Sequence, residues 1–451
     1  MRNDSTIILG AGPAGLAAGY YITLAGQSAL LLEAAAEAGG FARTFTDGEF
    51  RYDSGAHRFH DKDVGITEDM RALMGAELLE VHAPSQIFWE NRFLNFPLSP
   101  GNLVRRMGPV NLTRATVDLA TARLSARATT PDNFAQNAYH RYGKTIADAF
   151  LIGYSEKLWG IEAARLMPEV SGGRLKGLSA RTMLVELVRG QRGKTRHLDG
   201  SFFYPRGGYG RIADRLAEVI GPENILTNSR ITKIRHDGRR ITAVEINGRE
   251  SFTPERVIST LPPVQMLKLL DPAPPAPLIE LAGQLKFRDL LLIALFLDRP
   301  RVSANASIYF PARDIPFTRL YEPKNRSHAM APPDRTCVVV EIPCFAGDEQ
   351  WQRDDQDLRD LVAAHLHLAN LISPRDVLGG RIHRLRAAYP VLEVGVESIV
   401  RETQTYLNGL CNLHVVGRAG RFEYTHVHDL LRQGKELAQR MQASVKAAGI
   451  A

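Results

Sequence analysis

A glycine-rich turn near the N-terminus has the residue spacing of a dinucleotide-binding site. The segment Gly10-Ala-Gly12-Pro13-Ala14-Gly15 lies between an apolar stretch at 6–9 and a helical pattern at 16–24. Glycines at these positions let the backbone approach a pyrophosphate, which then sits at the positively polarised start of the helix. Glu33 ends the next predicted strand, where its carboxylate can accept hydrogen bonds from ribose hydroxyls. The unit predicts that these residues bind a dinucleotide, with a plain tight turn as the alternative.

A second set of glycines follows, together with an arginine and a histidine. Gly40 and Arg43 lie in a Gly-Gly-Phe-Ala-Arg segment, and Gly55-Ala56-His57 comes shortly after it. Taken with the first turn, these residues resemble the flavoprotein superfamily of amine oxidases, protoporphyrinogen oxidases and UDP-galactopyranose mutases, in which FAD lies extended across the fold. The resemblance implies that Gly40 and Arg43 contact FAD, with Arg43 reaching its phosphates. It also implies that Gly55, Ala56 and His57 lie against the flavin ring near N5.

The two histidines of this region have alternative interpretations. His57 and His60 could instead belong to a surface turn, or they could bind a metal ion as a pair. No cluster of carboxylates and histidines with helical ligand spacing accompanies them, so we expect no metal site.

Segments further along the chain resemble one branch of this superfamily, the UDP-galactopyranose mutases. The resemblance extends over nearly the whole chain, and its sharpest part is C-terminal. Its motifs are Phe93-Leu-Asn-Phe96-Pro, Tyr154-Ser-Glu-Lys-Leu-Trp159-Gly, Ile308-Tyr309-Phe-Pro, Pro316-Phe-Thr-Arg319, Ala388-Tyr389-Pro and Gly417-Arg418-Ala-Gly-Arg-Phe-Glu-Tyr424.

The resemblance implies a role for residues in each of these motifs. Arg319 and Arg418 correspond to two arginines that hold the diphosphate of a sugar nucleotide, and with His57 they are the expected catalytic residues. The other expected substrate contacts are Tyr309, Tyr389, Tyr424, Trp159, Phe96 and Arg174. Ile231 and Gly417 complete the expected FAD contacts.

A pair of guanidinium groups suits a diphosphate, because each stays charged and can make two parallel hydrogen bonds to phosphate oxygens. Arg418 could serve the FAD phosphates instead, and each tyrosine alone could be a half-buried core residue. Arg174 could equally lie on a solvated helix face. After Phe96 the glutamine that helps to read uracil in fungal-type mutases is absent, so the base and the sugar stay open.

The implied reaction is the redox-neutral interconversion of a pyranose and a furanose carried by a nucleotide. FAD would act in its reduced form, with N5 attacking the anomeric carbon and NADPH or NADH as a reductant. An FAD-dependent oxidase or desaturase of an amine, porphyrinogen or polyene is the alternative, because it would use the same fold. The basic, glycine-rich segment 189–197 could be a lid over phosphate or a solvated connection.

Length and periodicity predict an α/β protein with two domains that share an interrupted chain. The chain has 451 residues, of which 44% are hydrophobic and 23% charged, as in ordinary globular proteins. We expect a Rossmann-like FAD-binding domain from residues 1–100, 200–265 and 400–451. A mixed α+β substrate-binding domain, partly helical and partly an antiparallel sheet, is expected from 101–199 and 266–399. A hairpin is predicted at 230–246, with a two-residue turn at Asp237-Gly238.

Charge, cysteine content and hydropathy limit the partners and the location. The net charge is +7, but the basic residues are scattered among acids, which is not typical of a nucleic-acid-binding protein. Three cysteines without disulfide or zinc spacing suit a reducing compartment. The longest apolar run, 290–297, is too short to span a membrane, and the N-terminus lacks a secretory signal. We expect a cytoplasmic protein that binds a nucleotide sugar and neither nucleic acid nor membrane, and a homo-oligomer stays open.

Overall fold

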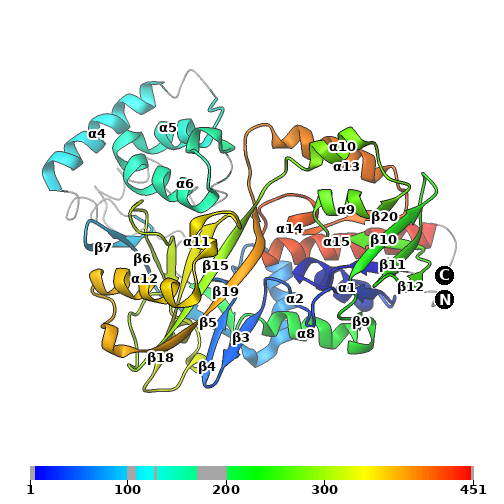
Figure 1. Cartoon of the computed structure of the whole chain (residues 1–451), viewed down its shortest axis with the longest axis horizontal. Helices are drawn as coiled ribbons and strands as arrows, with labels where there is room; N and C mark the ends of the chain where they lie inside the picture. Colours follow the sequence, from blue (N-terminus) through cyan, green and yellow to red (C-terminus); the bar gives the residue numbers. More distant parts are fainter. Residues whose placement is uncertain (1–5, 99–107, 126–129, 169, 171–200, 448–451) are drawn as a thin grey trace.

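The computed structural model describes residues 6–98, 108–125, 130–168, 170 and 201–447. Two lobes lie side by side, with both ends of the chain in one lobe and a long mixed sheet in the other (Figure 1). A group of helices covers one end of the mixed sheet. Arg174 and the segment 189–197 lie outside the described residues.

The first lobe is built on a five-stranded sheet whose neighbouring strands are all parallel. Its order is β20 (Leu413–Val415), β13 (Arg256–Ser259), β1 (Thr6–Leu9), β2 (Leu30–Leu32) and β9 (Ile225–Leu226). Ile8 and Leu31 pack in the core formed with α1 (Pro13–Leu24), α8 (Arg211–Ile220) and α15 (Val427–Ala447). Ile7 and Leu30 face a second core on the opposite side. Both faces are covered, which explains why β1 and β2 are almost wholly apolar.

A four-stranded sheet contributes to that second core. Its order is β12 (Glu250–Phe252), β11 (Ile241–Ile246), β10 (Ile231–His236) and β14 (Leu270–Asp271). The hairpin formed by β10 and β11 confirms the predicted strands, but the predicted two-residue turn is wrong, because residues 237–240 all lie between them. The Asp237 carboxylate accepts hydrogen bonds from the N–H groups of Arg239 and Arg240, each at 2.8 Å, and this local bonding stabilises the longer turn.

The second lobe contains a seven-stranded sheet. Its order is β19 (Val377–Pro390), β15 (Phe287–Leu297), β18 (Thr336–Cys344), β17 (Arg319–Tyr321), β16 (Ser307–Tyr309), β6 (Ser85–Trp89) and β7 (Arg92–Phe96). Leu291 and Ile293 of β15 pack with α12 (Asp355–Leu368), whereas Leu292 and Ala294 pack with β4 (Phe50–Asp53) on the other face. The apolar run at 290–297 is therefore a strand buried on both faces.

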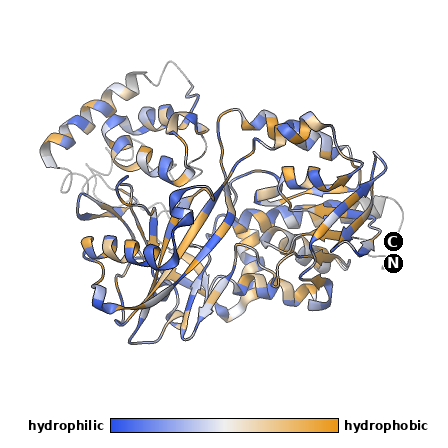
Figure 2. Cartoon of the chain, viewed as in Figure 1, coloured by the Kyte–Doolittle hydropathy of each residue, from blue (hydrophilic) through white to orange (hydrophobic). Residues whose placement is uncertain are grey.

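Three helices cover the β6–β7 edge of that sheet (Figure 1). They are α4 (Gly108–Ser125), α5 (Phe134–Ala147) and α6 (Gly153–Trp159). Ile87 and Leu94 of the sheet share a core with Tyr142 and Ile146 of α5. Orange and blue alternate along outer helices such as α4 and α12 in Figure 2, as expected for helices with one buried side.

Smaller elements complete the two lobes. They include the pairs β3 (Thr44–Asp47) with β4, and β5 (Leu78–His82) with β8 (Ser201–Pro205), and the helices α2 (Val64–Met74), α9 (Pro263–Leu269), α10 (Ala276–Ala282), α11 (Glu349–Gln352), α13 (Val396–Asn408) and α14 (Gly417–Gly420). The predicted α/β class, with a Rossmann-like sheet and a mixed second part, is confirmed. The domain limits stay a prediction, and β6 and β7, from the range 1–100, pair within the seven-stranded sheet. Among the described helices, none has the length and apolarity that a membrane crossing requires.

Candidate cofactor and substrate site

The predicted dinucleotide turn joins β1 to α1 through closely packed backbone. Gly10 has a φ of +97°, which favours glycine, and its N–H donates to the carbonyl of Leu32 at 2.8 Å. A Cβ on Gly15 would lie 1.9 Å from the carbonyl oxygen of Gly10, so that position requires glycine for the packing of α1 on β1. A Cβ on Gly12 would instead meet only the Cα of Gly40, at 3.9 Å. The space beside Gly12 can therefore receive a ligand.

The start of α1 can bind an anion. Gly12 is its N-cap, no described side chain caps it, Pro13 opens the first turn, and this turn has no acidic residue. Glu33 accepts hydrogen bonds from the N–H groups of Ala11 and Ala35, both at 2.8 Å, and so holds the turn beside the end of β2. Gly417 approaches from α14, where an added Cβ would lie 2.7 Å from that of Ala14.

Arg43 offers a second phosphate contact. Its Nε is buried and has no hydrogen-bond partner among the described residues. A buried guanidinium N–H without a partner is costly, and a phosphate oxygen would satisfy it. Ile231, by contrast, begins β10 and packs beside the apolar core, so only its backbone or aliphatic surface could contact a cofactor. The space beside Gly12, the uncapped start of α1 and the Nε of Arg43 therefore suit the phosphates of FAD, and the ribose contact expected of Glu33 stays a prediction.

The segment Gly55-Ala56-His57 lies in the interior between the lobes. Ala56 donates its N–H to Oε1 of Glu341 at 2.8 Å, and the ring of His57 stacks on Tyr209 with 4.9 Å between centroids. Burial and, after it, the positive charges of Arg418, Arg326 and Arg319 together lower the pKa of His57 to about 3. The imidazole is therefore neutral at ordinary pH and cannot act there as an imidazolium acid.

Arg319 is held by a carboxylate directly across the sheet. It opens β17, and in the β17–β18 register it pairs with Glu341. Its Nε and Nη2 donate to Oε2 of Glu341 at 2.9 and 2.6 Å. Burial acts to lower the pKa of Arg319, but the charge of Glu341 raises it, with Tyr389 and Tyr309 acting in the same direction. Arg319 thus lies charged among phenols.

Arg418 reaches one of these phenols, Tyr389, from the other lobe. It lies in α14, and its Nε and Nη2 donate to the carbonyl of Thr425 at 3.0 and 2.5 Å. Its guanidinium lies 5.7 Å from the ring centre of Tyr389 and 5.3 Å from that of Tyr424. Burial raises the pKa of Tyr389, as does Glu341, while Arg319 and Arg418 both lower it. Tyr389 therefore lies within the electrostatic reach of both arginines.

The other expected substrate residues form two aromatic groups beside these arginines. Trp159 lies with its ring centre 5.4 Å from that of Tyr424 and 6.2 Å from that of Tyr389. The ring centre of Phe96 lies 5.2 Å from that of Tyr309. Arg174 is the exception, because it lies outside the described residues.

Four residues near this group were not predicted as site residues. They are Tyr154, Tyr209, Arg326 and Glu341. A signal existed for Glu341, because it is the single acid within the buried, largely apolar strand β18, and a buried charge requires a partner. For Arg326 the sequence carries no comparable signal. Its guanidinium donates to a backbone carbonyl, that of His57, at 2.9 Å, and every residue type offers such an acceptor.

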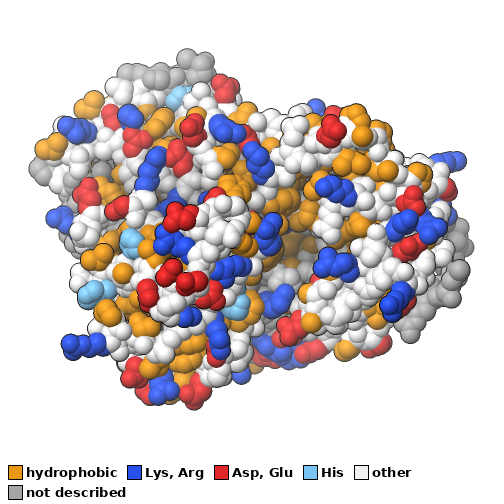
Figure 3. All heavy atoms as spheres, in the orientation of Figure 1, with side chains coloured by type: hydrophobic (Ala, Val, Ile, Leu, Met, Phe, Trp, Pro, Cys, Tyr) orange, Lys and Arg blue, Asp and Glu red, His pale blue; other side chains and the backbone are white. Residues whose placement is uncertain are grey.

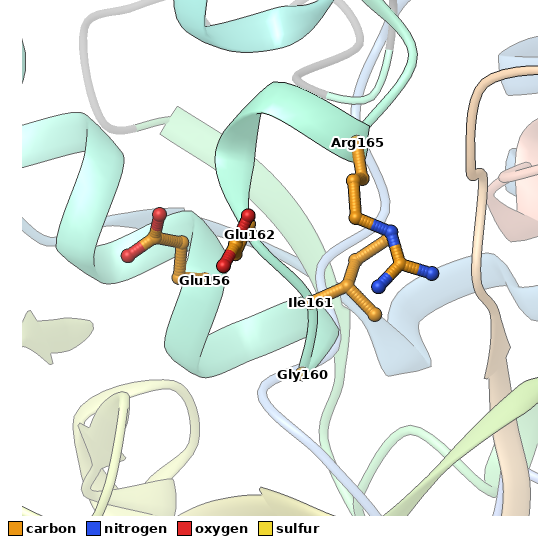
Figure 4. A pocket seen from close by; sticks show the side chains of 5 residues that line it. All are labelled: Glu156, Gly160, Ile161, Glu162 and Arg165. Carbon is orange, nitrogen blue, oxygen red and sulfur yellow. The ribbon is translucent and has the colours of Figure 1, made fainter.

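The described residues hold no group of three or more histidines, cysteines or acids that could bind a metal ion. A hollow between the lobes is visible in Figure 3, with hydrophobic atoms inside and basic side chains near its rim. A separate open depression of about 410 Å³ lies at the end of α6 and is lined by Glu156, Gly160, Ile161, Glu162 and Arg165 (Figure 4). It contains none of the predicted site residues.

Alanine substitutions at two glycines test the cofactor turn. We expect Gly12→Ala to lose bound flavin while the apo fold survives, because its Cβ would meet only the ligand. Gly15→Ala should also lower the melting temperature of the apo protein, because its Cβ would overlap the Gly10 carbonyl. Visible flavin absorbance and circular dichroism melting measure the two effects. Wild-type flavin content in Gly12→Ala would contradict this assignment.

Substitution of Glu341 tests the ion pair. An amide cannot accept from both Ala56 and Arg319, so Glu341→Gln should lower the free energy of unfolding by about 1–3 kcal/mol. Glu349→Gln is the control, since this exposed acid at the start of α11 pairs with Arg353 just after that helix, and its loss should cost under about 0.5 kcal/mol. Urea unfolding measures both, and equal losses would show that the buried pair has no special role.

Comparison with known proteins places this geometry in a family. A family model described as flavin containing amine oxidoreductase matches residues 13–442. The fold is similar to that of a crystal structure of reduced UDP-galactopyranose mutase, with a TM-score of 0.84 and 21% identity over 100% of this chain and 96% of that chain. No curated protein matches the sequence.

Two further solved structures share the fold. One is an Exiguobacterium protein described as a protoporphyrinogen oxidase, with a TM-score of 0.75 and 18% identity over 98% of this chain and 100% of that one. The other is cyclohexylamine oxidase from Brevibacterium oxydans, with a TM-score of 0.70 and 15% identity over 99% of this chain and 100% of that one. Because the family model spans most of the sequence, the chain belongs to the family of flavin-containing amine oxidoreductases and its expected cofactor is FAD.

Proposed function

We propose that the protein is a flavin-dependent mutase that interconverts the pyranose and furanose forms of a nucleotide sugar, of the UDP-galactose type. The observation that carries the proposal is the approach of two arginines from distant segments to one phenol. Arg319 from β17 and Arg418 from α14 both lower the pKa of the Tyr389 hydroxyl, against the raising effects of burial and Glu341. Two permanent positive charges beside a phenol suit the diphosphate of such a substrate.

The pairing of Arg319 with Glu341 leaves part of its guanidinium for a substrate. Nε and Nη2 donate to the carboxylate, so Nη1 is the group that would bind a phosphate oxygen. Tyr309 and Tyr389 lie close enough to act on the Arg319 charge, and their hydroxyls can donate hydrogen bonds without adding charge. Trp159 and Phe96 would supply aromatic faces beside them.

The residues of the chain would orient the substrate and stabilise its leaving group. When bound, reduced flavin supplies a nucleophilic nitrogen toward the anomeric carbon. Arg319 and Arg418 would stabilise the departing diphosphate and retain it until it recombines with the sugar. Since His57 is neutral, we infer that the diphosphate leaves without a proton from this imidazole.

The local charge favours this proposal over an amine oxidase, although both activities occur on this fold. Arg319, Arg326 and Arg418 all lie near enough to lower the pKa of His57. Their positive charge would repel a protonated amine and attract an anionic diphosphate. An oxidase or desaturase of an uncharged substrate is the remaining alternative.

An anaerobic assay separates the two classes. Dithionite-reduced protein should convert UDP-galactofuranose to UDP-galactopyranose without net electron transfer, as followed by chromatography. UDP, dTDP and GDP sugars should be compared, because the uracil-reading glutamine is absent. Steady oxygen uptake with an amine or a porphyrinogen, and no ring interconversion, would overturn the proposal.

Arginine variants test the diphosphate contacts. Arg319→Ala and Arg418→Ala should each lower kcat/KM by about 100-fold or more while FAD stays bound. Arg421→Ala is a matched control, because this neighbouring exposed arginine pairs with Glu423 and should keep near-wild-type turnover. Turnover and flavin absorbance are measured on the same samples. Loss of flavin from Arg418→Ala would assign this arginine to the cofactor instead.

A further inference from the structure

Lys157 of α6 makes an unusual set of contacts with a segment outside this helix. Its Nζ donates hydrogen bonds to the backbone carbonyls of Phe310, Ala312, Ile315 and Phe317, at 2.6, 2.8, 2.9 and 2.9 Å. All four acceptors belong to the single connection between β16 and β17. An ammonium group attracts carbonyl dipoles strongly in a water-poor environment, so it can hold this connection in one shape.

The elements joined by this lysine carry the candidate substrate residues. The connection begins after Tyr309, the last residue of β16, and ends before Arg319, the first residue of β17. On the other side, α6 carries Tyr154 three residues before Lys157 and Trp159 two residues after it. One side chain therefore links an arginine and three aromatic residues that come from two segments about 150 residues apart.

Other contacts hold α6 itself in place. Arg288 of β15 donates to the carbonyls of Lys157 and Leu158 at the end of α6, each at 3.3 Å, and to that of Pro343 at 2.9 Å. At the start of α6, a Cβ on Gly153 would approach the side chain of Arg313 to 3.4 Å. The helix thus lies tightly against both β15 and the connection, so Lys157 acts from a fixed position.

We propose that Lys157 is a positioning residue that sets the placement of Arg319 and Tyr309 relative to Tyr154 and Trp159. The inference rests on the proposed function for its effect on the substrate, but its effect on the connection is independent of any substrate. Lys157 would not touch the sugar nucleotide. Its contribution to turnover would come from holding the carbonyls that precede Arg319.

Because Lys157 can gain or lose its charge, the stability of the connection should depend on pH. Burial lowers the pKa of Lys157 to about 7, while Asp314 in the connection acts to raise it. Among the described residues, Glu156 on α6, which pairs with Arg313 in the connection, Arg288 on β15 and His365 on α12 also lie nearby. Burial lowers the pKa of His365 below its ordinary value, so this imidazole takes up its proton at a lower pH than an exposed histidine does.

The sign of the effect follows from these groups. Below about pH 7 the ammonium has three N–H donors for the four carbonyls, and above it the neutral amine has two and no charge. Because the pKa of Lys157 in the closed connection lies below that of a solvated lysine, opening takes up a proton above about pH 7 and becomes less favourable as the pH rises. Burial of the charged ammonium therefore costs free energy on the acidic side of that pKa, and this cost is relieved as the pH rises above it.

Hydrogen exchange of the flavin-bound protein tests the inference without a substrate. In Lys157→Met, backbone amides of residues 310–318 should exchange about tenfold faster than in wild type. In wild type, after correction for intrinsic exchange, the same amides should gain protection as the pH rises above about 7, because opening then requires uptake of a proton, and the Lys157→Met protein should lack this pH dependence. Lys144→Met is the control, because this exposed lysine of α5 pairs with Asp148, just after the helix.

Chemical rescue separates the ammonium charge from packing. Lys157→Ala should regain protection of residues 310–318 when methylammonium is added, and Lys157→Met should not. With a nucleotide sugar, KM should rise about tenfold in Lys157→Met, with a smaller change in kcat. Absence of mutase turnover in wild type would overturn the proposed function alone. Unchanged exchange in Lys157→Met, or a flat wild-type pH profile if that variant does not fold, would overturn the role of Lys157.

Discussion

The buried ion pair between Arg319 and Glu341 is the interaction on which the candidate site depends. The Arg319 side chain is 15% exposed and that of Glu341 2%, so neither charge would be stable there without the other. One oxygen of Glu341 accepts from the guanidinium, and the other accepts from the N–H of Ala56 in the segment expected beside the flavin. A single carboxylate therefore fixes the expected phosphate contact relative to the expected flavin contact.

The two lobes contribute different parts of this arrangement. The parallel sheet presents the glycine turn and the uncapped start of α1, where backbone N–H groups suit the phosphates of a cofactor. The mixed sheet presents Arg319 on β17, with Glu341 beside it on β18. Arg418 comes from α14 in the first lobe, and its Nη1 donates to the carbonyl of Ala388 on β19 of the second. Residues from both lobes thus contact one another beside the ion pair.

Prediction from sequence succeeded where local structure depends on neighbouring residues alone. The strand, tight turn and helix around Gly10 and Gly15 could be assigned because they follow one another within a short segment. The hairpin turn at 237–240 was wrong because hydrogen bonds of the Asp237 side chain, rather than the Asp-Gly pair, determine its length. The Lys157 contacts were not predicted, since backbone carbonyl acceptors have no signature in the sequence.

Local patterns were thus enough to establish the α/β class, the first strand, turn and helix, and the strands of the hairpin at 230–246, because hydrophobic period and turn propensity act over a few residues. They could not establish which side chains meet. The contact of Arg319 with Glu341 depends on the register of β17 and β18, and the approach of Arg418 to Tyr389 depends on the packing of two lobes. Such contacts follow from the topology of the whole chain, in which burial and pairing of distant segments are decided together.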